Sequence, residues 1–314
     1  MLDASRNFGP ASKSCWGKVR AFEYIAATDT RHAVALLAEH GLSARLLAGG
    51  TDLLVELKAE SHVPRVVIDI SRAADLKQIG QTAEGLSIGA LATHSEIMRS
   101  PLIREMFPAL VAAAHTIGAV QTRNLGTLGG NLVTGVPSMD SGPTLIALDA
   151  SVTIAGPTGS RQMPLTEFFV RPRKTVLKTD ELLTEIVIHK RNLGKPAHFL
   201  KFGLRKGQAL ALVNVAASLW VDPEKNVFVA PRIALGAVAP TVMRASKAEA
   251  YLDGCTVTPE AMAEAGRIAV GDAKPIGDFR AAAEYRRDLI AVLTARALAG
   301  ACALAGAKRP PGKP

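Results

Sequence analysis

Two glycine pairs in similar surroundings constrain this chain more than any other feature. The first is Gly49-Gly50 and the second is Gly129-Gly130. A glycine pair lets backbone N–H groups approach an anion without a Cβ in the way. Because each pair follows an apolar run, the two predict that separate parts of the chain grip one extended ligand, a dinucleotide diphosphate.

Polar neighbours strengthen this interpretation. Thr51 stands beside the first pair, and Thr127 and Asn131 flank the second, where each can add a donor. Taken alone, a glycine pair is more often an ordinary tight turn. The second pair belongs to a longer polar, glycine-rich run, 116–140, between strongly apolar segments. That setting favours a ligand site.

Several common nucleotide and metal motifs are missing from the sequence. No Gly-x-Gly-x-x-Gly opens a helix after a strand, so a Rossmann dinucleotide fold is not predicted. The chain also lacks Gly-x-x-x-x-Gly-Lys-Ser/Thr and His-Glu-x-x-His. The sequence therefore does not predict a P-loop nucleotidase or a zinc hydrolase.

The hydrophobic content of 48% is typical of a globular protein. A length of 314 residues is enough for two or three subdomains with their own cores. No run approaches the roughly 20 apolar residues of a membrane span. Residues 1–20 lack the apolar core of a secretory signal, so we expect a cytoplasmic protein. Cys15, Cys255 and Cys302 are too far apart for a disulfide framework or a cluster ligand set.

The net charge of +9, from 37 basic and 28 acidic residues, suits an anionic ligand. The basic residues are scattered, and aromatic residues make up only 4% of the chain. Nucleic-acid binding, which uses clustered cations and stacking rings, is therefore not predicted.

The first part of the chain mixes strands and helices without regular alternation, which predicts an α+β fold. After an irregular extension at 1–20, we expect one unit at 21–75, with a strand–helix–strand–strand order, and a second unit at 76–194. The predicted strands are 20–25, 45–48, 65–70, 85–90, 151–154 and 185–188, and the predicted helices are 29–40, 95–99, 106–117 and 143–148.

A separate α+β domain is predicted at 195–305, after a linker at 191–196. Thr258 is expected to cap a helix that has proline at its first position. Residues 306–314 are expected to be a disordered tail. The predicted strands are 197–204, 213–221 and 232–239, followed by helices at 246–252, 259–270 and 285–302.

Four motifs occur in the order found in one known family. They are Ala-Gly-Gly-Thr-Asp-Leu at 48–53, Arg-Asn-x-Gly-Thr-x-Gly-Gly-Asn at 123–131, Arg-Ile-Ala-Leu-Gly-Ala-Val-Ala-Pro at 232–240, and Asp-x-Arg-Ala-x-x-Glu-Tyr-Arg-Arg at 278–287. Over about 20–305 the chain resembles the FAD-binding medium subunits of molybdenum hydroxylases, the family of xanthine and carbon monoxide dehydrogenases.

This resemblance implies a fold. Residues 21–194 would form a two-subdomain FAD-binding domain of the vanillyl-alcohol-oxidase or PCMH type. Residues 195–305 would form the C-terminal domain of carbon monoxide dehydrogenase flavoproteins, with a three-stranded sheet and helices.

The resemblance also implies the FAD contacts. Thr127 and Asn131 would meet the phosphate and ribityl region, and Asp140 the sugar hydroxyls, although an aspartate there is also a common helix cap. Ile117 and Leu183 would lie against the isoalloxazine ring. The implied contacts are Leu46, Leu47, Ala48, Gly49, Gly50, Thr51, Asp52, Leu53, Ile117, Thr127, Gly129, Gly130, Asn131, Thr134, Asp140, Leu183 and Lys201.

By the same resemblance the chain is an oxidoreductase subunit that transfers electrons and carries no catalytic residue or metal of its own. Its partners would be a large molybdopterin-binding subunit and a small subunit with two [2Fe–2S] clusters, in a dimer of heterotrimers. Electrons would leave through FAD to NAD⁺, oxygen, a quinone or a cytochrome.

Two alternatives stay open. A stand-alone FAD-dependent oxidase or reductase would need an acid, base or covalent link near the flavin, for which His94 and His115 are the candidates. A non-enzymatic nucleotide-binding protein would keep the glycine segments without redox partners.

Overall fold

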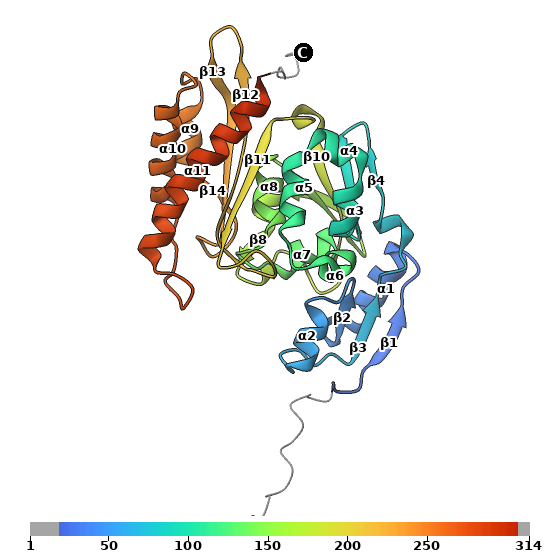
Figure 1. Ribbon diagram of the computed structural model, residues 1–314. Helices are drawn as coiled ribbons and strands as arrows, with labels where there is room; N and C mark the ends of the chain where they lie inside the picture. Colours follow the sequence, from blue (N-terminus) through green and yellow to red (C-terminus); the bar gives the residue numbers. More distant parts are fainter. Residues whose placement is uncertain (1–18, 307–314) are drawn as a thin grey trace, which may run out of the picture.

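A computed structural model describes residues 19–306 of the chain. The predicted extension at 1–20 and tail at 306–314 lie almost entirely outside these residues. Three lobes follow one another along the chain (Figure 1). We call them the N-terminal lobe (residues 23–76), the middle lobe (79–192) and the C-terminal lobe (197–305).

The N-terminal lobe is a parallel three-stranded sheet in the order β1-β3-β2, with two helices. The first helix begins after Asp29, whose carboxylate accepts a hydrogen bond from the His32 N–H at 2.9 Å. It ends at Gly41, where φ is 50°. The elements are β1 (Glu23–Ala26), α1 (Thr30–His40), β2 (Ala44–Leu47), α2 (Leu53–Lys58) and β3 (Val66–Asp69).

The middle lobe is built on an antiparallel five-stranded sheet in the order β4-β5-β10-β6-β7. This order confirms the predicted α+β fold. The strands are β4 (Ile79–Gln81), β5 (Gly85–Gly89), β6 (Ser151–Gly156), β7 (Gly159–Pro164) and β10 (Leu182–His189), with a small ribbon of β8 (Phe169–Arg171) and β9 (Lys174–Thr175). The helices are α3 (His94–Arg99), α4 (Pro101–Met106), α5 (Pro108–His115), α6 (Val120–Leu125), α7 (Leu128–Thr134) and α8 (Ser141–Ala147).

The glycine-rich run is largely helical, which the sequence did not predict. Gly129 and Gly130 lie in the first turn of α7 and not in a loop. Thr127 is the N-cap, and its Oγ1 accepts a hydrogen bond from the Gly130 N–H at 3.1 Å. Such a cap offsets part of the unfavourable helix propensity of two glycines.

The C-terminal lobe places an antiparallel sheet between the middle lobe and a layer of three helices (Figure 1). Phe199 and Ala216 belong to the apolar core of the middle lobe, whereas Val213 and Val215 pack with the helices. A two-residue fourth strand adds to the three predicted. The elements are β11 (Ala197–Gly203), β12 (Ala211–Asp222), β13 (Val227–Gly236), β14 (Met243–Arg244), α9 (Ser246–Leu252), α10 (Pro259–Asp272) and α11 (Ala283–Ala305).

The segment predicted as a linker is anchored at both ends. Asn192 is buried and its Nδ2 donates to the Leu148 carbonyl at 2.9 Å. Lys195 is buried as well, and its Nζ donates to the Ala230 carbonyl at 2.7 Å. The middle and C-terminal lobes therefore meet through a packed junction. Thr258 caps α10 as predicted, accepting from the Ala261 N–H at 3.1 Å.

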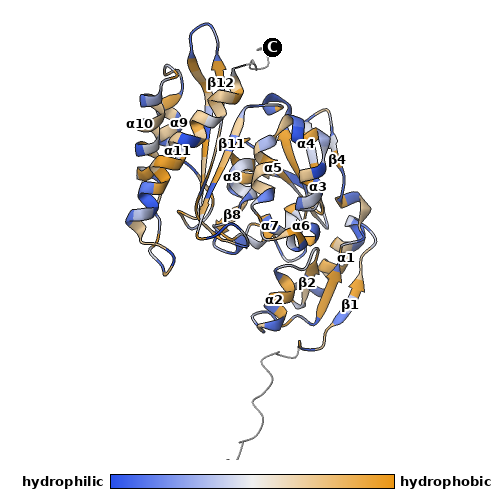
Figure 2. Cartoon of the chain, in the orientation of Figure 1, coloured by the Kyte–Doolittle hydropathy of each residue, from blue (hydrophilic) through white to orange (hydrophobic). Residues whose placement is uncertain are grey.

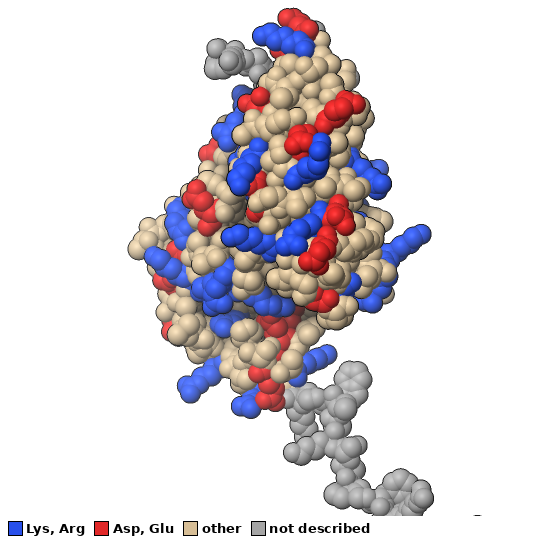
Figure 3. All heavy atoms as spheres, turned by 90° about the vertical axis from the view of Figure 1, so that its left-hand side faces the viewer, with Lys and Arg blue, Asp and Glu red and all other residues tan. Residues whose placement is uncertain are grey.

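Within residues 19–306, α11 is the one helix whose length and apolar composition would allow it to cross a membrane. Core helices of soluble proteins pass the same test. Its buried residues, such as Ile290 and Leu298, pack in the core against the sheet. Figure 2 shows polar and apolar residues mixed along α10 and α11. In the space-filling view of this side, basic and acidic side chains are interspersed over the surface (Figure 3).

Candidate functional site

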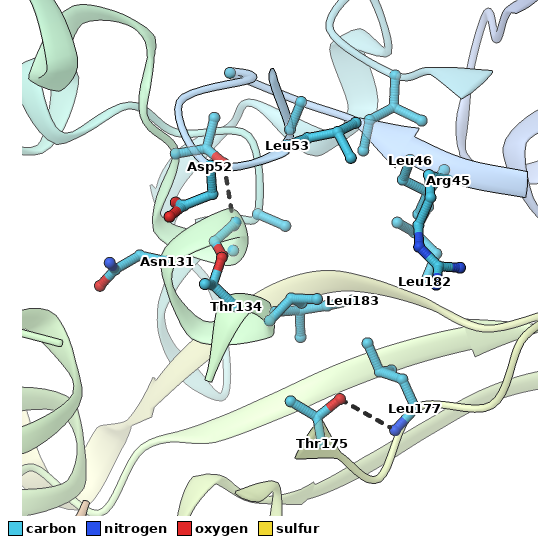
Figure 4. A pocket seen from close by; sticks show the side chains of 18 of the residues that line it. Arg45, Leu46, Asp52, Leu53, Asn131, Thr134, Thr175, Leu177, Leu182 and Leu183 are labelled. Atoms are coloured by element: carbon cyan, nitrogen blue, oxygen red, sulfur yellow. Dashed lines mark hydrogen bonds between the residues drawn. The ribbon is translucent and has the colours of Figure 1, made fainter. Parts of the chain in front are cut away.

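The main cavity of the described chain lies between the N-terminal and middle lobes and has a volume of about 570 Å³. Ligand pockets typically measure roughly 300–1,000 Å³. Its walls come from the segment joining β2 to α2, the turn after α5, the start of α7 and residues within 173–183. Figure 4 shows Asp52, Asn131, Thr134 and Leu183 around this space.

The segment joining β2 to α2 presents unpaired backbone donors to the cavity. The N–H groups of residues 49–53 donate to no acceptor within residues 19–306. Gly50 has φ of 72°, in the left-handed region that favours glycine. Consecutive N–H groups without internal partners form an anion-binding nest. We call residues 49–53 the nest; its donors fit the diphosphate of FAD.

The second glycine pair has a different role. The Gly129 N–H donates to the Ala90 carbonyl at 2.8 Å, and the Gly130 N–H is used by the Thr127 cap. A Cβ on Gly129 would lie 2.6 Å from the Cβ of Ala90. Both N–H groups of this pair thus have partners within the chain, and Gly129 belongs to a tightly packed wall of the cavity.

Close packing also explains Gly49 in the first pair. A Cβ on this residue would lie 1.8 Å from the Leu125 carbonyl oxygen at the end of α6. The nest is therefore pressed against the middle lobe at a position that only glycine permits. Gly49 serves the contact between lobes as well as the donors of the nest.

Polar side chains near the cavity leave donors available. The Asn131 Oδ1 accepts from the Ser141 hydroxyl at 2.6 Å, while its Nδ2 has no acceptor in the described chain. The Thr51 hydroxyl makes no hydrogen bond within residues 19–306 either. Thr134, in contrast, donates to the Gly130 carbonyl at 2.8 Å. Asn131 and Thr51 thus have donors free to meet ligand oxygens.

Apolar side chains line the remaining wall. Ile117 and Leu183 both border the cavity, and Leu183 is buried. Leu182 and Leu177 add further apolar surface at the side shown with Arg45 in Figure 4. A mostly apolar wall with a few polar groups is typical of cofactor sites.

Every predicted contact lines the cavity except Leu47, Asp140 and Lys201. The Lys201 Nζ lies 2.5 Å from Asp140 Oδ2 and donates to the Thr116 carbonyl at 3.1 Å. Asp140 makes no capping hydrogen bond with its side chain and instead accepts from Asn214 at 2.9 Å. Burial raises the pKa of Asp140, while Lys201 opposes this shift. The buried pair supports the turn that carries Ile117.

His94 lines the cavity, although sequence reasoning named it only as a candidate acid, base or covalent link of a stand-alone oxidase or reductase. Burial, with a smaller effect of Arg123, lowers the pKa of its imidazole to about 4. No local pattern marks the other wall residues, since chain topology brings them together. They include Arg45, Ala90, Thr122 and Leu177.

The fold and the site together define a flavoprotein subunit with a dinucleotide cavity between two lobes. Residues 20–190 match the FAD binding domain in molybdopterin dehydrogenase, and residues 198–301 match the CO dehydrogenase flavoprotein C-terminal domain. The chain belongs to the family of FAD-binding medium subunits of molybdopterin-dependent dehydrogenases.

Individual relatives agree with this assignment. The chain is 33% identical to a putative xanthine dehydrogenase FAD-binding subunit of Escherichia coli, over 91% of this chain and 97% of that protein. It is 32% identical to the carbon monoxide dehydrogenase medium chain of Hydrogenophaga pseudoflava, over 90% and 97%.

Solved structures show the same likeness. A carbon monoxide dehydrogenase structure from Hydrogenophaga pseudoflava superposes with a TM-score of 0.87 at 33% identity, covering 91% of this chain and 99% of that one. Quinoline 2-oxidoreductase from Pseudomonas putida 86 gives 0.85 at 29% identity, covering 92% and 99%.

Proposed function

We propose that this chain passes electrons from the [2Fe–2S] clusters of a small partner subunit, through FAD, to NAD⁺, oxygen, a quinone or another acceptor. FAD supplies a group that exchanges electrons singly or in pairs when it is bound. The unpaired donors of the nest, facing a cavity with an apolar wall, are the observation that carries this proposal.

Different residues of the cavity would bind different parts of FAD. The nest and Asn131 would hold the diphosphate and neighbouring hydroxyls, and Ile117 and Leu183 would enclose the flavin ring. Lys201 and Asp140 would act through the Thr116–Ile117 turn, because neither lines the cavity. Leu47 would act through the nest, since its side chain lies 3.1 Å from the Cβ position of Gly50.

The assembly proposed for this chain is a dimer of heterotrimers with a large molybdopterin-binding subunit and a small [2Fe–2S] subunit, in the cytoplasm. One of the relatives is the medium chain of a carbon monoxide dehydrogenase, which supports a multi-subunit complex. We also propose that residues 21–194 and 195–305 act as the FAD-binding and C-terminal domains, the first with subdomains at about 21–75 and 76–194.

Stopped-flow spectroscopy on the intact complex, depleted of FAD, tests the direction of electron flow. Substrate is expected to bleach the iron–sulfur absorbance at an unchanged rate, while turnover with the natural acceptor is lost and returns when FAD is added. The control is the same complex loaded with FAD. If substrate fails to reduce the clusters although molybdenum is present, FAD belongs on the substrate side, as in a stand-alone oxidase or reductase.

A further inference from the structure

His94 is held at a fixed place in the wall of the cavity. It is the first residue of α3 and is 2% exposed. Thr93 and Glu96 form a capping box that fixes the start of this helix. The His94 backbone N–H also donates to the Gly126 carbonyl at 3.1 Å. These contacts fix the backbone at His94, and burial encloses its imidazole.

The ring is polar, buried and without a partner. Its Nδ1 is buried and makes no hydrogen bond within residues 19–306, and no bond is formed by Nε2 either. Buried polar atoms are nearly always paired in folded proteins, because burial removes their hydrogen bonds to water. Nδ1 is fully enclosed, whereas Nε2 keeps accessible surface, so Nε2 is the ring nitrogen that a ligand atom in the cavity can reach.

The direction of the ring points to the chemistry of that ligand. A Cβ placed on Gly126 would lie 3.5 Å from His94 Cδ2 and 3.6 Å from the Thr51 hydroxyl. The edge of the ring that carries Cδ2 and Nε2 thus faces the same spot as Thr51, which belongs to the nest. Both groups converge on the place where the unpaired N–H groups would bind an anion.

The protonation state fits a neutral donor. Burial and the nearby Arg123 keep the imidazole uncharged at neutral pH, so one ring nitrogen carries the single proton. A buried lone pair without a donor is tolerated better than a buried N–H without an acceptor. The proton therefore belongs on Nε2, and Nδ1 keeps only its lone pair.

We propose that His94 donates a hydrogen bond from Nε2 to a phosphate oxygen of the dinucleotide diphosphate, beside Thr51 and the nest. This inference rests on the proposed FAD site and adds a contact to it. A hydrogen bond to a charged acceptor contributes about 1.5–3 kcal/mol, which corresponds to roughly a 10- to 150-fold change in affinity.

The test measures FAD binding to the full chain freed of flavin, by quenching of flavin fluorescence. His94→Leu is expected to raise the Kd at least about tenfold, whereas His94→Gln, whose amide nitrogen can replace Nε2, stays within about threefold. The matched control is His198→Leu. His198 also has a buried Nδ1 without a partner, but it lies in β11 away from the cavity, so FAD affinity is expected to stay unchanged.

Ligand fragments locate the contact. ADP, measured as a competitor of FAD, is expected to lose affinity in His94→Leu by the same factor as FAD, whereas riboflavin is expected to show no change. Should the Leu variant fail to fold by thermal unfolding, His94→Asn replaces it, because its amide lies near Nδ1 and is expected to lose affinity relative to Gln.

Three results would overturn the inference: a Leu variant that binds FAD as tightly as the original chain, a Gln variant as weak as Leu, or an effect on FAD and riboflavin that spares ADP. Failure of the original chain to bind FAD at all would instead refute the proposed site, so the two failures are distinguishable.

Discussion

At the scale of single residues, the glycines of this site are explained by contacts within the chain. Gly129 packs against Ala90, which follows β5. A Cβ added to Gly129 would lie 2.6 Å from the Ala90 Cβ and 2.7 Å from the Ala90 carbonyl oxygen. Gly130 would meet only the Thr127 hydroxyl, at 2.8 Å. Two adjacent glycines therefore differ in what they tolerate.

The matched substitutions Gly129→Ala and Gly130→Ala test this difference. Overpacking against Ala90 is expected to lower the free energy of unfolding by about 1–3 kcal/mol in Gly129→Ala and to weaken FAD binding by moving the wall. Gly130→Ala displaces one hydroxyl and gains helix propensity, so its loss is expected to be smaller. Urea unfolding measures both. Equal losses would show that packing against Ala90 does not matter.

The buried Lys195 is expected to make the free energy of unfolding depend on pH. Burial, with the nearby Arg232, lowers the pKa of its ammonium to about 7, below the value of about 10.4 in an unfolded chain. Between these values the unfolded chain holds a proton that the folded chain does not. The free energy of unfolding therefore gains at most about 1.4 kcal/mol per pH unit as the pH rises from 7 toward 10.

Replacing Lys195 by Met removes this titration. The difference in unfolding free energy between the original chain and Lys195→Met is expected to shift in favour of the original chain from pH 7 to pH 9. Lys190→Met, at an exposed lysine, is the control and is expected to give no such slope. Parallel curves for all three proteins would mean that Lys195 is protonated in the folded state.

At the scale of elements, the sequence predicts long, strongly patterned segments well and short ones poorly. The bounds of β11, β12, α1, α10 and α11 were predicted within a few residues, because their apolar patterns are long. β13 begins five residues before its predicted start at 232, and β14 was not predicted. The helix α9 was predicted although it has only seven residues. The helices α2, α6 and α7 have six or seven residues, which is too short for a clear period. Their caps and contacts with other segments determine them.

The same contrast holds for the site. The nest was visible in the sequence because glycine pairs are local signals. His94 and the cavity residues within 173–182 come to the cavity through sheet topology, which no local pattern reveals, whereas Leu183 was named from the family resemblance. Asp140 and Lys201 are 61 residues apart, and their direct pairing is a further product of tertiary packing.

This buried pair joins β11 to the start of α8 and holds the end of α5. Lys201→Met or Asp140→Asn leaves its partner unpaired, so each is expected to lower the free energy of unfolding by about 3–5 kcal/mol. The double variant is expected to lose less than the sum of the two. A double-mutant cycle measured by urea unfolding gives the coupling energy, and strict additivity would contradict the interaction.

At the scale of the whole molecule, the lobes have unequal roles. The middle and C-terminal lobes share an apolar core and the Asp140–Lys201 pair, and so form one body. The N-terminal lobe contributes the nest and is pressed onto that body at Gly49. The cavity at their junction explains why a single chain needs both lobes to hold an extended dinucleotide.

The flavin released from the purified chain tests the central claim most directly. The chain has donors for a diphosphate and, in our account, no covalent link, so acid precipitation is expected to release one FAD per chain and leave a colourless protein pellet. Chromatography of the supernatant identifies the flavin. FMN in the supernatant, flavin retained on the peptide, or a chain that neither carries nor takes up FAD would contradict the account.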